Sequence, residues 1–204
     1  MPVFDMERLA YNKFTEFSNL CYNILAYLMV QNEDIWKLLK YDTPDALSKP
    51  NLTLEEKRKM IYDGNGDSEH YNVYRSPFVD EAFTEQTSQL RIYALTINPK
   101  NRSLATIDLN IDCITHTKLV NIDGGKSRVE LMVEEVLKTL NGQEIDGVGK
   151  LFFDAREAMY DGARFSIFNN RYFYGCQITM SVHYGELEPN TYGCLLYTSP
   201  SPRD

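Results

Sequence analysis

Residues 104–117 read LATIDLNIDCITHT, and from Ala105 to Cys113 apolar and polar side chains alternate without a break. Successive side chains of a β-strand point to opposite faces, so this alternation predicts a strand. One face carries the apolar residues Ala105, Ile107, Leu109, Ile111 and Cys113. The other face carries Thr106, Asp108, Asn110 and Asp112. We therefore expect one face of this strand in the core and the other in water.

The preceding stretch, QLRIYALTINP at residues 89–99, is rich in β-branched and aromatic residues and predicts a second strand. The turn sequence PKNRS follows it, so the two strands should form a hairpin. Alternation gives one face to Leu90, Ile92, Ala94 and Thr96, and the other to Arg91, Tyr93, Leu95 and Ile97. Because both faces are largely apolar, we expect this strand to be covered on both sides.

The segment SRVELMVEEVLKTLNG, residues 127–142, repeats its apolar side chains at helical spacing and ends at a glycine. It predicts one long helix. A short strand is expected within GVGKLFFD, residues 147–154. The segment ARFSIFNNRYFYGCQITMSVHY, residues 163–184, predicts two strands around a turn at Asn169 and Asn170.

Helices are expected before the hairpin. Residues 6–30 carry apolar side chains at roughly helical spacing. Asn32 is expected to cap a short helix over residues 33–41, and a further helical turn is expected in DTPDALS. Thr53 with Glu56 has the spacing of a capping box, which predicts another helix start.

The predicted order of helices, hairpin, helix and strands is that of an α+β protein. We expect a mainly antiparallel sheet packed against one long helix, with a helical N-terminal part. The expected organisation is a helical part at 1–62, a long loop at 63–87, an α+β core at 88–185 and a tail at 186–193. A loop this long is often functional or an oligomer contact.

The composition is that of an ordinary globular protein of 204 residues, with 43% hydrophobic residues and a net charge of -8. That charge predicts repulsion from bare nucleic acid. No stretch is long and apolar enough to span a membrane, and the first residues do not have the pattern of a signal peptide. The four cysteines form no CxxC pair, and Cys113 and Cys176 are expected as buried free thiols.

The residues GGKS, Gly124 to Ser127, resemble the end of a phosphate-binding loop, but the required earlier glycine is replaced by Val120. We therefore expect a glycine turn that leads into a helix, with Ser127 as its cap. His70 and His183 are isolated, and no nucleophile motif accompanies them.

Asp108, Asp112 and His116 lie at even spacing on one strand face. Alternate residues of a strand are about 7 Å apart, so ligands four residues apart lie too far from each other to share one metal ion unaided. A solvated polar face is the favoured interpretation. The sequence therefore predicts no catalytic residues, no metal and no cofactor.

Three segments, IWKLLKYDTPDALSKPNLTLEEKRKMIY, PFVDEAFTEQTSQLRIYALTINPKN and LNIDCITHTKLVNIDGGKSRVELMVEEVLKTLNGQEIDGVGKLFF, resemble small neck proteins of tailed bacteriophages. The resemblance spans roughly Leu25 to Tyr184. It implies a non-enzymatic virion protein of the tail-terminator or head–tail connector type, made in the host bacterial cytoplasm. Such proteins form homomeric rings and contact other neck and tail proteins, while DNA passes without specific binding and no membrane is involved.

Two sets of residues are candidates for roles in such a ring. The acidic face with Asp108 and Asp112 suits a channel wall, because like charge keeps phosphates from adhering. Tyr172, Phe173 and Tyr174 are candidate subunit contacts, as is the loop at 63–87.

Two other functions stay open. A small phage-encoded regulatory or inhibitor protein would bind a host partner through the N-terminal helices. A metal-dependent nuclease would need a carboxylate cluster, for which Asp108, Asp112 and Glu130 are available although no spacing favours them.

The last eleven residues, CLLYTSPSPRD from Cys194 to Asp204, resemble a sequencing-library transposase adapter translated in one frame. We expect the native sequence within this chain to stop at Gly193, which fits a metagenomic phage source. Function is therefore not expected in residues 194–204.

Overall fold

The computed structural model describes residues 18–63, 71–77, 86–100, 104–153, 162–168 and 172–185. The helices are α2 (Leu20–Gln31), α3 (Asp34–Lys40), α4 (Leu54–Lys59) and α5 (Arg128–Leu140). Short 3₁₀ helices lie at Ala46–Ser48 and Thr117–Leu119. The strands are β1 (Val73–Tyr74), β2 (Ser88–Pro99), β3 (Leu104–His116), β4 (Asn121–Ile122), β5 (Lys126–Ser127), β6 (Glu144–Ile145), β7 (Gly149–Phe152), β8 (Ala163–Phe168) and β9 (Phe173–Gly185).

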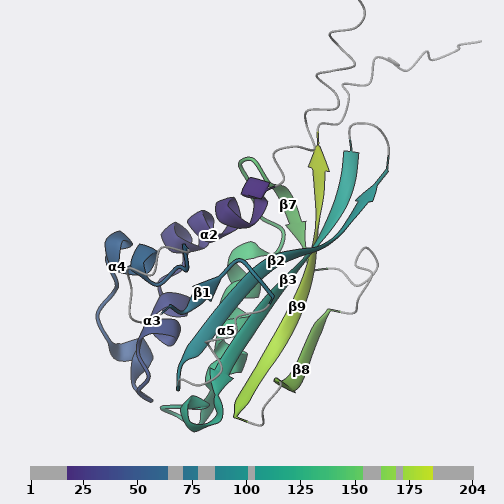
Figure 1. The fold of residues 1–204 in the computed structure, drawn as a ribbon. Coiled ribbons are helices and arrows are strands. Elements are labelled where there is room, and N and C mark those ends of the chain that lie inside the picture. The colour runs from purple at the N-terminus through teal and green to yellow at the C-terminus, as the bar shows by residue number, and fades with distance from the viewer. Residues whose placement is uncertain are drawn as a thin grey trace, which may run out of the picture.

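One strongly twisted sheet organises the fold, with strands in the order β1-β2-β3-β9-β7-β6 (Figure 1). Strand β8 also pairs with β9, along the half of β9 that β7 does not reach. All pairs in this sheet are antiparallel except β1 with β2. This confirms the predicted hairpin of β2 and β3 and the predicted α+β class.

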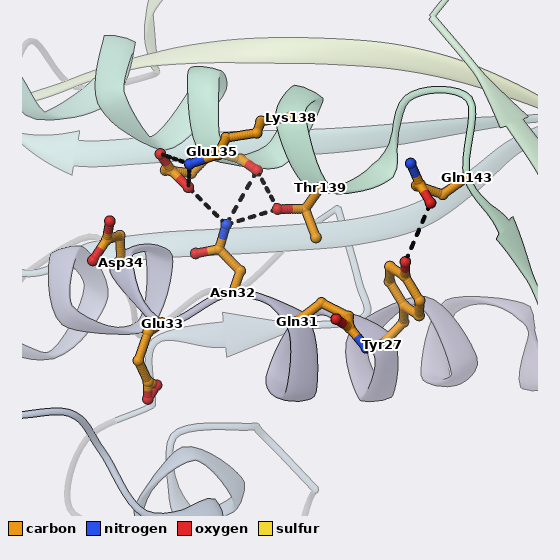
Figure 2. A pocket seen from close by; sticks show the side chains of 9 residues that line it. All are labelled: Tyr27, Gln31, Asn32, Glu33, Asp34, Glu135, Lys138, Thr139 and Gln143. Atoms are coloured by element: carbon orange, nitrogen blue, oxygen red, sulfur yellow. Dashed lines mark hydrogen bonds and ion pairs between the residues drawn. The ribbon is translucent and has the colours of Figure 1, made fainter.

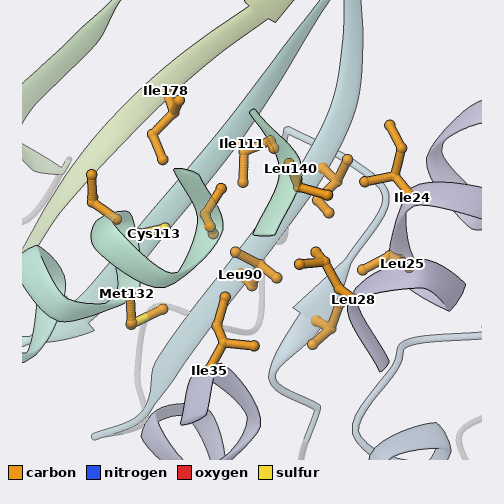
Figure 3. Close-up of a cluster of buried hydrophobic side chains, with 14 of the residues drawn as sticks. Ile24, Leu25, Leu28, Ile35, Leu90, Ile111, Cys113, Met132, Leu140 and Ile178 are labelled. Atoms are coloured by element: carbon orange, nitrogen blue, oxygen red, sulfur yellow. The ribbon is translucent and has the colours of Figure 1, made fainter. Parts of the chain in front are cut away.

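The helices pack on one face of the sheet and share a single hydrophobic core with it (Figure 3). Ile24 and Leu28 of α2, Ile35 of α3 and Met132 of α5 all contribute to this cluster, together with Ile111 of β3. The sheet face that carries these apolar residues is called the helix-covered face below. The helical part and the sheet are therefore one folding unit.

Helix α5 forms as the sequence predicts. Its apolar stripe faces the core, with Val129, Met132, Val136 and Leu140 buried. Beyond its end, Gly142 has a φ of 75°, a left-handed conformation that glycine adopts without steric cost.

The helix caps predicted at Asn32 and Thr53 are also present. The Asn32 side chain accepts a hydrogen bond from the Ile35 backbone amide at 2.8 Å. Thr53 and Glu56 form the reciprocal capping box that begins α4. The DTPDALS segment contains the 3₁₀ turn at Ala46–Ser48. The predicted first helix is described only from residue 18 onward, and its earlier residues lie outside the described ranges.

The side-chain alternation predicted for β2 is wrong beyond its middle. The register with β3 shifts between Ala94 and Thr96, which marks a β-bulge. After the bulge Thr96 pairs with Asp108, so it lies on the polar face rather than beside Leu90 and Ile92. The expected cover on both faces is absent here, because Leu95 is 36% exposed and Ile97 is 43% exposed.

The loop expected at 63–87 is not wholly irregular. Strand β1 lies within it and pairs in parallel with Leu90 and Arg91 of β2. This strand was not predicted from the sequence, because two residues are too few to show an alternation of apolar and polar side chains. The proposed oligomer contact in this loop falls mainly on residues outside the described ranges.

A buried arginine joins the N-terminal helices to α5. The Arg128 guanidinium is fully buried and donates to four backbone carbonyl oxygens. The acceptors are Leu38 at 2.6 Å, Tyr41 at 2.8 Å, Thr43 at 2.9 Å and Leu119 at 2.9 Å. Two of these carbonyls lie at the end of α3, where a helix has no internal donors left to offer.

Candidate functional site

The sheet face opposite the helices carries a connected set of polar side chains, which we call the polar face. Figure 1 shows α5 on the other side of the sheet. The polar face is built from three adjacent strands and comprises Arg91, Tyr93, Thr96, Thr106, Asp108, Asn110, Asp112, Gln177, Thr179 and Ser181. Most of these side chains are buried, and they bond mainly to one another.

Asp108 is held from both neighbouring strands. Its carboxylate accepts hydrogen bonds from Ser181 Oγ at 2.8 Å and Thr96 Oγ1 at 2.5 Å. In the next polar row, Thr179 Oγ1 donates to Asn110 Oδ1 at 2.9 Å. Such rows of cross-strand bonds satisfy polar groups that would otherwise be costly to bury.

Asp112 lies in the most strongly perturbed part of the polar face. It accepts hydrogen bonds from Tyr93 Oη at 3.1 Å and Gln177 Nε2 at 3.0 Å. Burial raises the pKa of the Asp112 carboxyl, while these two donors and the nearby Arg91 oppose the rise. Burial, followed by the charge of Asp112, raises the pKa of Tyr93, and burial lowers that of Arg91.

Asp108 and Asp112 do not lie on the solvated acidic face that the sequence predicts. Asp108 is 0% exposed and Asp112 is 2% exposed. Both carboxylates are occupied by bonds from β2 and β9, so neither presents its charge to water. A channel wall needs accessible charge, and the burial of these two residues is a correction to their expected placement on a solvated face.

The three aromatic residues proposed as subunit contacts differ in accessibility. Tyr172 is 62% exposed, Tyr174 is half-buried against the core and Phe173 is only 1% exposed. The Phe173 ring meets the His116 ring edge-on, with 5.3 Å between the ring centroids, and the Tyr172 ring stacks on His116 with 6.2 Å between centroids. Of the three, Tyr172 is the side chain that a second chain can reach most readily.

His116 is part of this aromatic group. Its Nδ1 accepts a hydrogen bond from the Lys118 amide at 3.2 Å. Burial, followed by the nearby Lys118 charge, lowers the pKa of His116. Within the described ranges, no group of three histidine, cysteine or carboxylate side chains is arranged to hold a metal ion.

The structure also separates the carboxylates proposed for a nuclease. Asp108 and Asp112 lie on the polar face, whereas Glu130 is an exposed residue of α5, which covers the opposite face. These three residues are therefore on different sides of the sheet and form no cluster.

The GGKS segment is a tight turn, as predicted. Gly124 and Gly125 have φ values of 85° and 74° between the short strands β4 and β5. Ser127 occupies the N-cap position of α5, but its side chain makes no capping hydrogen bond. The segment thus leads into a helix as expected, without the expected side-chain cap.

Cys113 and Cys176 are buried free thiols, which confirms the sequence prediction. They lie directly opposite each other on β3 and β9, facing the core. Burial raises the pKa of both thiols, that of Cys176 to about 11.

A polar groove with a volume of about 410 Å³ lies between α2 and α5 and was not predicted from the sequence (Figure 2). Asn32 lies at its centre and donates to Glu135 Oε2 at 2.8 Å and Thr139 Oγ1 at 2.7 Å. At one end Tyr27 Oη donates to Gln143 Oε1 at 3.5 Å. The capping pattern identified Asn32, but its second set of partners lies more than a hundred residues away in the chain.

No helix in the described ranges is long and apolar enough to cross a membrane. Comparison with curated proteins finds no match. The YomW family model, in contrast, matches residues 32–182, which covers most of the chain and nearly all of the sheet. This family is phage-derived and takes its name from a gene of a Bacillus phage and prophage. The chain therefore belongs to the YomW family and is a phage protein.

Proposed function

We propose that this phage protein is a non-enzymatic structural component of the virion neck, a ring subunit that joins or terminates the tail at the head. The family match supports phage origin, and the resemblance to neck proteins between Leu25 and Tyr184 supports this more specific role. The proposed partners are further copies of the same chain and other neck and tail proteins.

One structural observation carries the ring proposal: large apolar side chains are exposed at two opposite margins of the sheet. Leu95 and Ile97 lie on β2 at one margin. Phe165 of β8 is 45% exposed at the other margin, and Tyr172 lies close to it in the chain. A subunit that contacts one neighbour on each side needs two different contact surfaces, as in a head-to-tail ring.

The polar residues of the sheet support a structural role. Asp108, Asn110 and Asp112 are engaged in hydrogen bonds within the chain, and Arg128 is fully occupied by backbone carbonyls. These groups stabilise the fold, and their burial keeps them away from a substrate.

The proposal is tested in a phage that carries a stop codon in this gene. Electron microscopy of the resulting lysate should show filled or empty heads separated from tails, or tails of abnormal length. Mass spectrometry should detect the protein in purified wild-type particles. Normal infectious particles from the stop-codon phage, with no trace of the protein in wild-type virions, would rule out the neck function.

The groove in Figure 2 favours one alternative, a small regulatory protein that binds a host partner through the N-terminal helices. Its lining combines carboxylates with amide side chains that have further hydrogen-bonding capacity. This alternative predicts that the protein stays in the infected cell and is absent from particles, so the same mass-spectrometry experiment separates the two functions.

A further inference from the structure

Strand β8 is held on one side only. It pairs with β9 along Ala163–Phe168, and no other described strand pairs with it. Its side chains from Ala163 to Ser166 are all exposed. An edge strand with an exposed phenylalanine, and without proline or a bulge, is a template for pairing with another chain.

The backbone of β8 shows which groups are available. Thr179 N donates to Gly162 O at 2.9 Å, which fixes the alternation of the β8–β9 ladder. The even-numbered residues of β8 therefore bond to β9. The peptide groups of Ala163, Phe165 and Ile167 point away from the sheet and can accept a further strand.

The opposite margin of the sheet has a second open stretch, on β2. Near the start of β2 the edge is covered, because Leu90 N donates to Asn72 O at 2.8 Å and the Ala94 backbone hydrogen-bonds Cys21. The bulge after Ala94 reverses the alternation and turns the peptide groups of Ile97 outward. No described strand pairs with this side of Leu95–Pro99, which we call the distal β2 edge.

We propose that the β8 edge of one copy pairs with the distal β2 edge of the next copy. The inference rests on the proposed ring and names the contact that would join its subunits. The occupant is a second copy because the chain itself carries both halves of the contact. The β8 edge offers the outward peptide groups of Ala163, Phe165 and Ile167 and the exposed Phe165 side chain. The distal β2 edge offers the outward peptide groups and the exposed side chain of Ile97, since Pro99 has no N–H to donate.

Charge is compatible with this pairing. The chain has 29 acidic and 21 basic residues, yet neither edge contains an aspartate or a glutamate. Copies of a protein with a net charge of -8 repel each other on average, so a contact free of carboxylates is favourable. The two edges avoid that repulsion.

The relative position of the two edges fits a closed assembly. Ile97 of β2 pairs with Ile107 of β3. Phe165 of β8 pairs with Cys176 of β9, which in turn pairs with Cys113 of β3, six residues from Ile107. Six residues along a strand correspond to about 20 Å, and the four strands from β2 to β8 are about 19 Å wide. If Phe165 of one copy lies beside Ile97 of the next, the strands are therefore inclined by roughly 45° to the ring axis. This is close to the 35–45° strand tilt of closed barrels.

Two charge-introducing variants test the contact, because edge lysines block strand addition. Phe165→Lys disables the β8 edge, and Ile97→Lys disables the distal β2 edge. Val30→Lys is the matched control, since Val30 is 69% exposed on α2, away from both edges. Circular dichroism and thermal unfolding should first show that all three variants fold like the wild type.

Sedimentation velocity should show assembly of the wild type and of Val30→Lys, and monomers for each edge variant. The concentration needed for half-assembly should rise at least about 100-fold in each edge variant, as for a central contact residue. Mixing the two edge variants should give a heterodimer, because one intact edge of each kind remains. Hydrogen exchange should then protect the amides of residues 163–168 in one partner and 95–99 in the other.

Three outcomes would overturn the inference. If both edge variants assemble like the wild type, the ring is built by other contacts. If Ile97→Lys still dimerises while Phe165→Lys does not, β8 pairs with itself. A wild type that stays monomeric at about 1 mM also refutes the pairing, because the dissociation constant of the contact would then exceed about 1 mM. The virion experiment is independent of all three, so the neck function and the edge contact fail separately.

Discussion

Replacing Arg128 with methionine should be among the most damaging single changes to this protein. Methionine has a similar reach but no donors, so four buried carbonyl oxygens lose the guanidinium at once. Each hydrogen bond to a charged group contributes about 1.5–3 kcal/mol, and the removal of a buried charge offsets part of that sum. We expect a net loss of about 3–5 kcal/mol, because four buried carbonyl oxygens are left without this donor and the gain from removing the buried charge offsets only part of that cost.

The assay is urea unfolding at pH 7, followed by circular dichroism and by Trp36 fluorescence. Trp36 is buried in α3, whose end the guanidinium holds, so both signals should report the loss. Arg128→Lys should fall between the wild type and the methionine variant, because an ammonium has three donors and lacks the planar fork. Arg58→Met, at an exposed position on α4, is the control and should stay within about 0.5 kcal/mol of the wild type. A loss below about 1 kcal/mol for Arg128→Met would refute the reasoning.

Four further changes test the polar contacts by urea unfolding. Asp112→Asn should stabilise the protein at pH 7, and the gain should disappear below about pH 4. Burial raises the carboxyl pKa above its ordinary 3.8, so the wild type loses stability as pH rises through the folded pKa; Asp146→Asn, an exposed control, should show no such gain. Asn32→Leu should cost about 2 kcal/mol, since it removes both a helix cap and the bonds to α5. Thr53→Ala should cost about 1 kcal/mol through loss of the capping box. The lowered pKa of His116 means that the unfolded chain binds more protons below pH 6.5, so wild-type stability should fall there more steeply than that of His116→Asn.

The local patterns of the sequence predicted the helix-covered face well. The apolar stripe of α5 and the alternation of β3 each identify residues that the structure buries, such as Val136 and Ile111. Both patterns are read within a single element, where the spacing of side chains depends only on backbone geometry. The same holds for the capping residues Asn32 and Thr53.

The polar face was not predictable in the same way. The alternation of β3, considered alone, places Asp108 on a solvated face. In the structure it is buried, and Ser181, 73 residues later, supplies a hydrogen-bond donor to it across the strand pair. The bulge at Leu95 is similar, since the imperfect alternation of β2 was visible but its cause lies in the register with β3. Both features depend on pairing between distant segments, which spacing within one segment does not reveal.

The position of β9 has a consequence for how the protein forms. Strand β9 supplies the partner for β3, β7 and β8, yet it is the last of the described strands to be synthesised. Until residues 173–185 leave the ribosome, the β2–β3 hairpin has an unpaired side and uncompensated carboxylates. Pairings this distant in sequence form slowly, and incomplete sheets are prone to aggregate. The newly made chain should therefore depend on chaperones until β9 is in place, and truncation before β9 should yield insoluble protein rather than a smaller folded one.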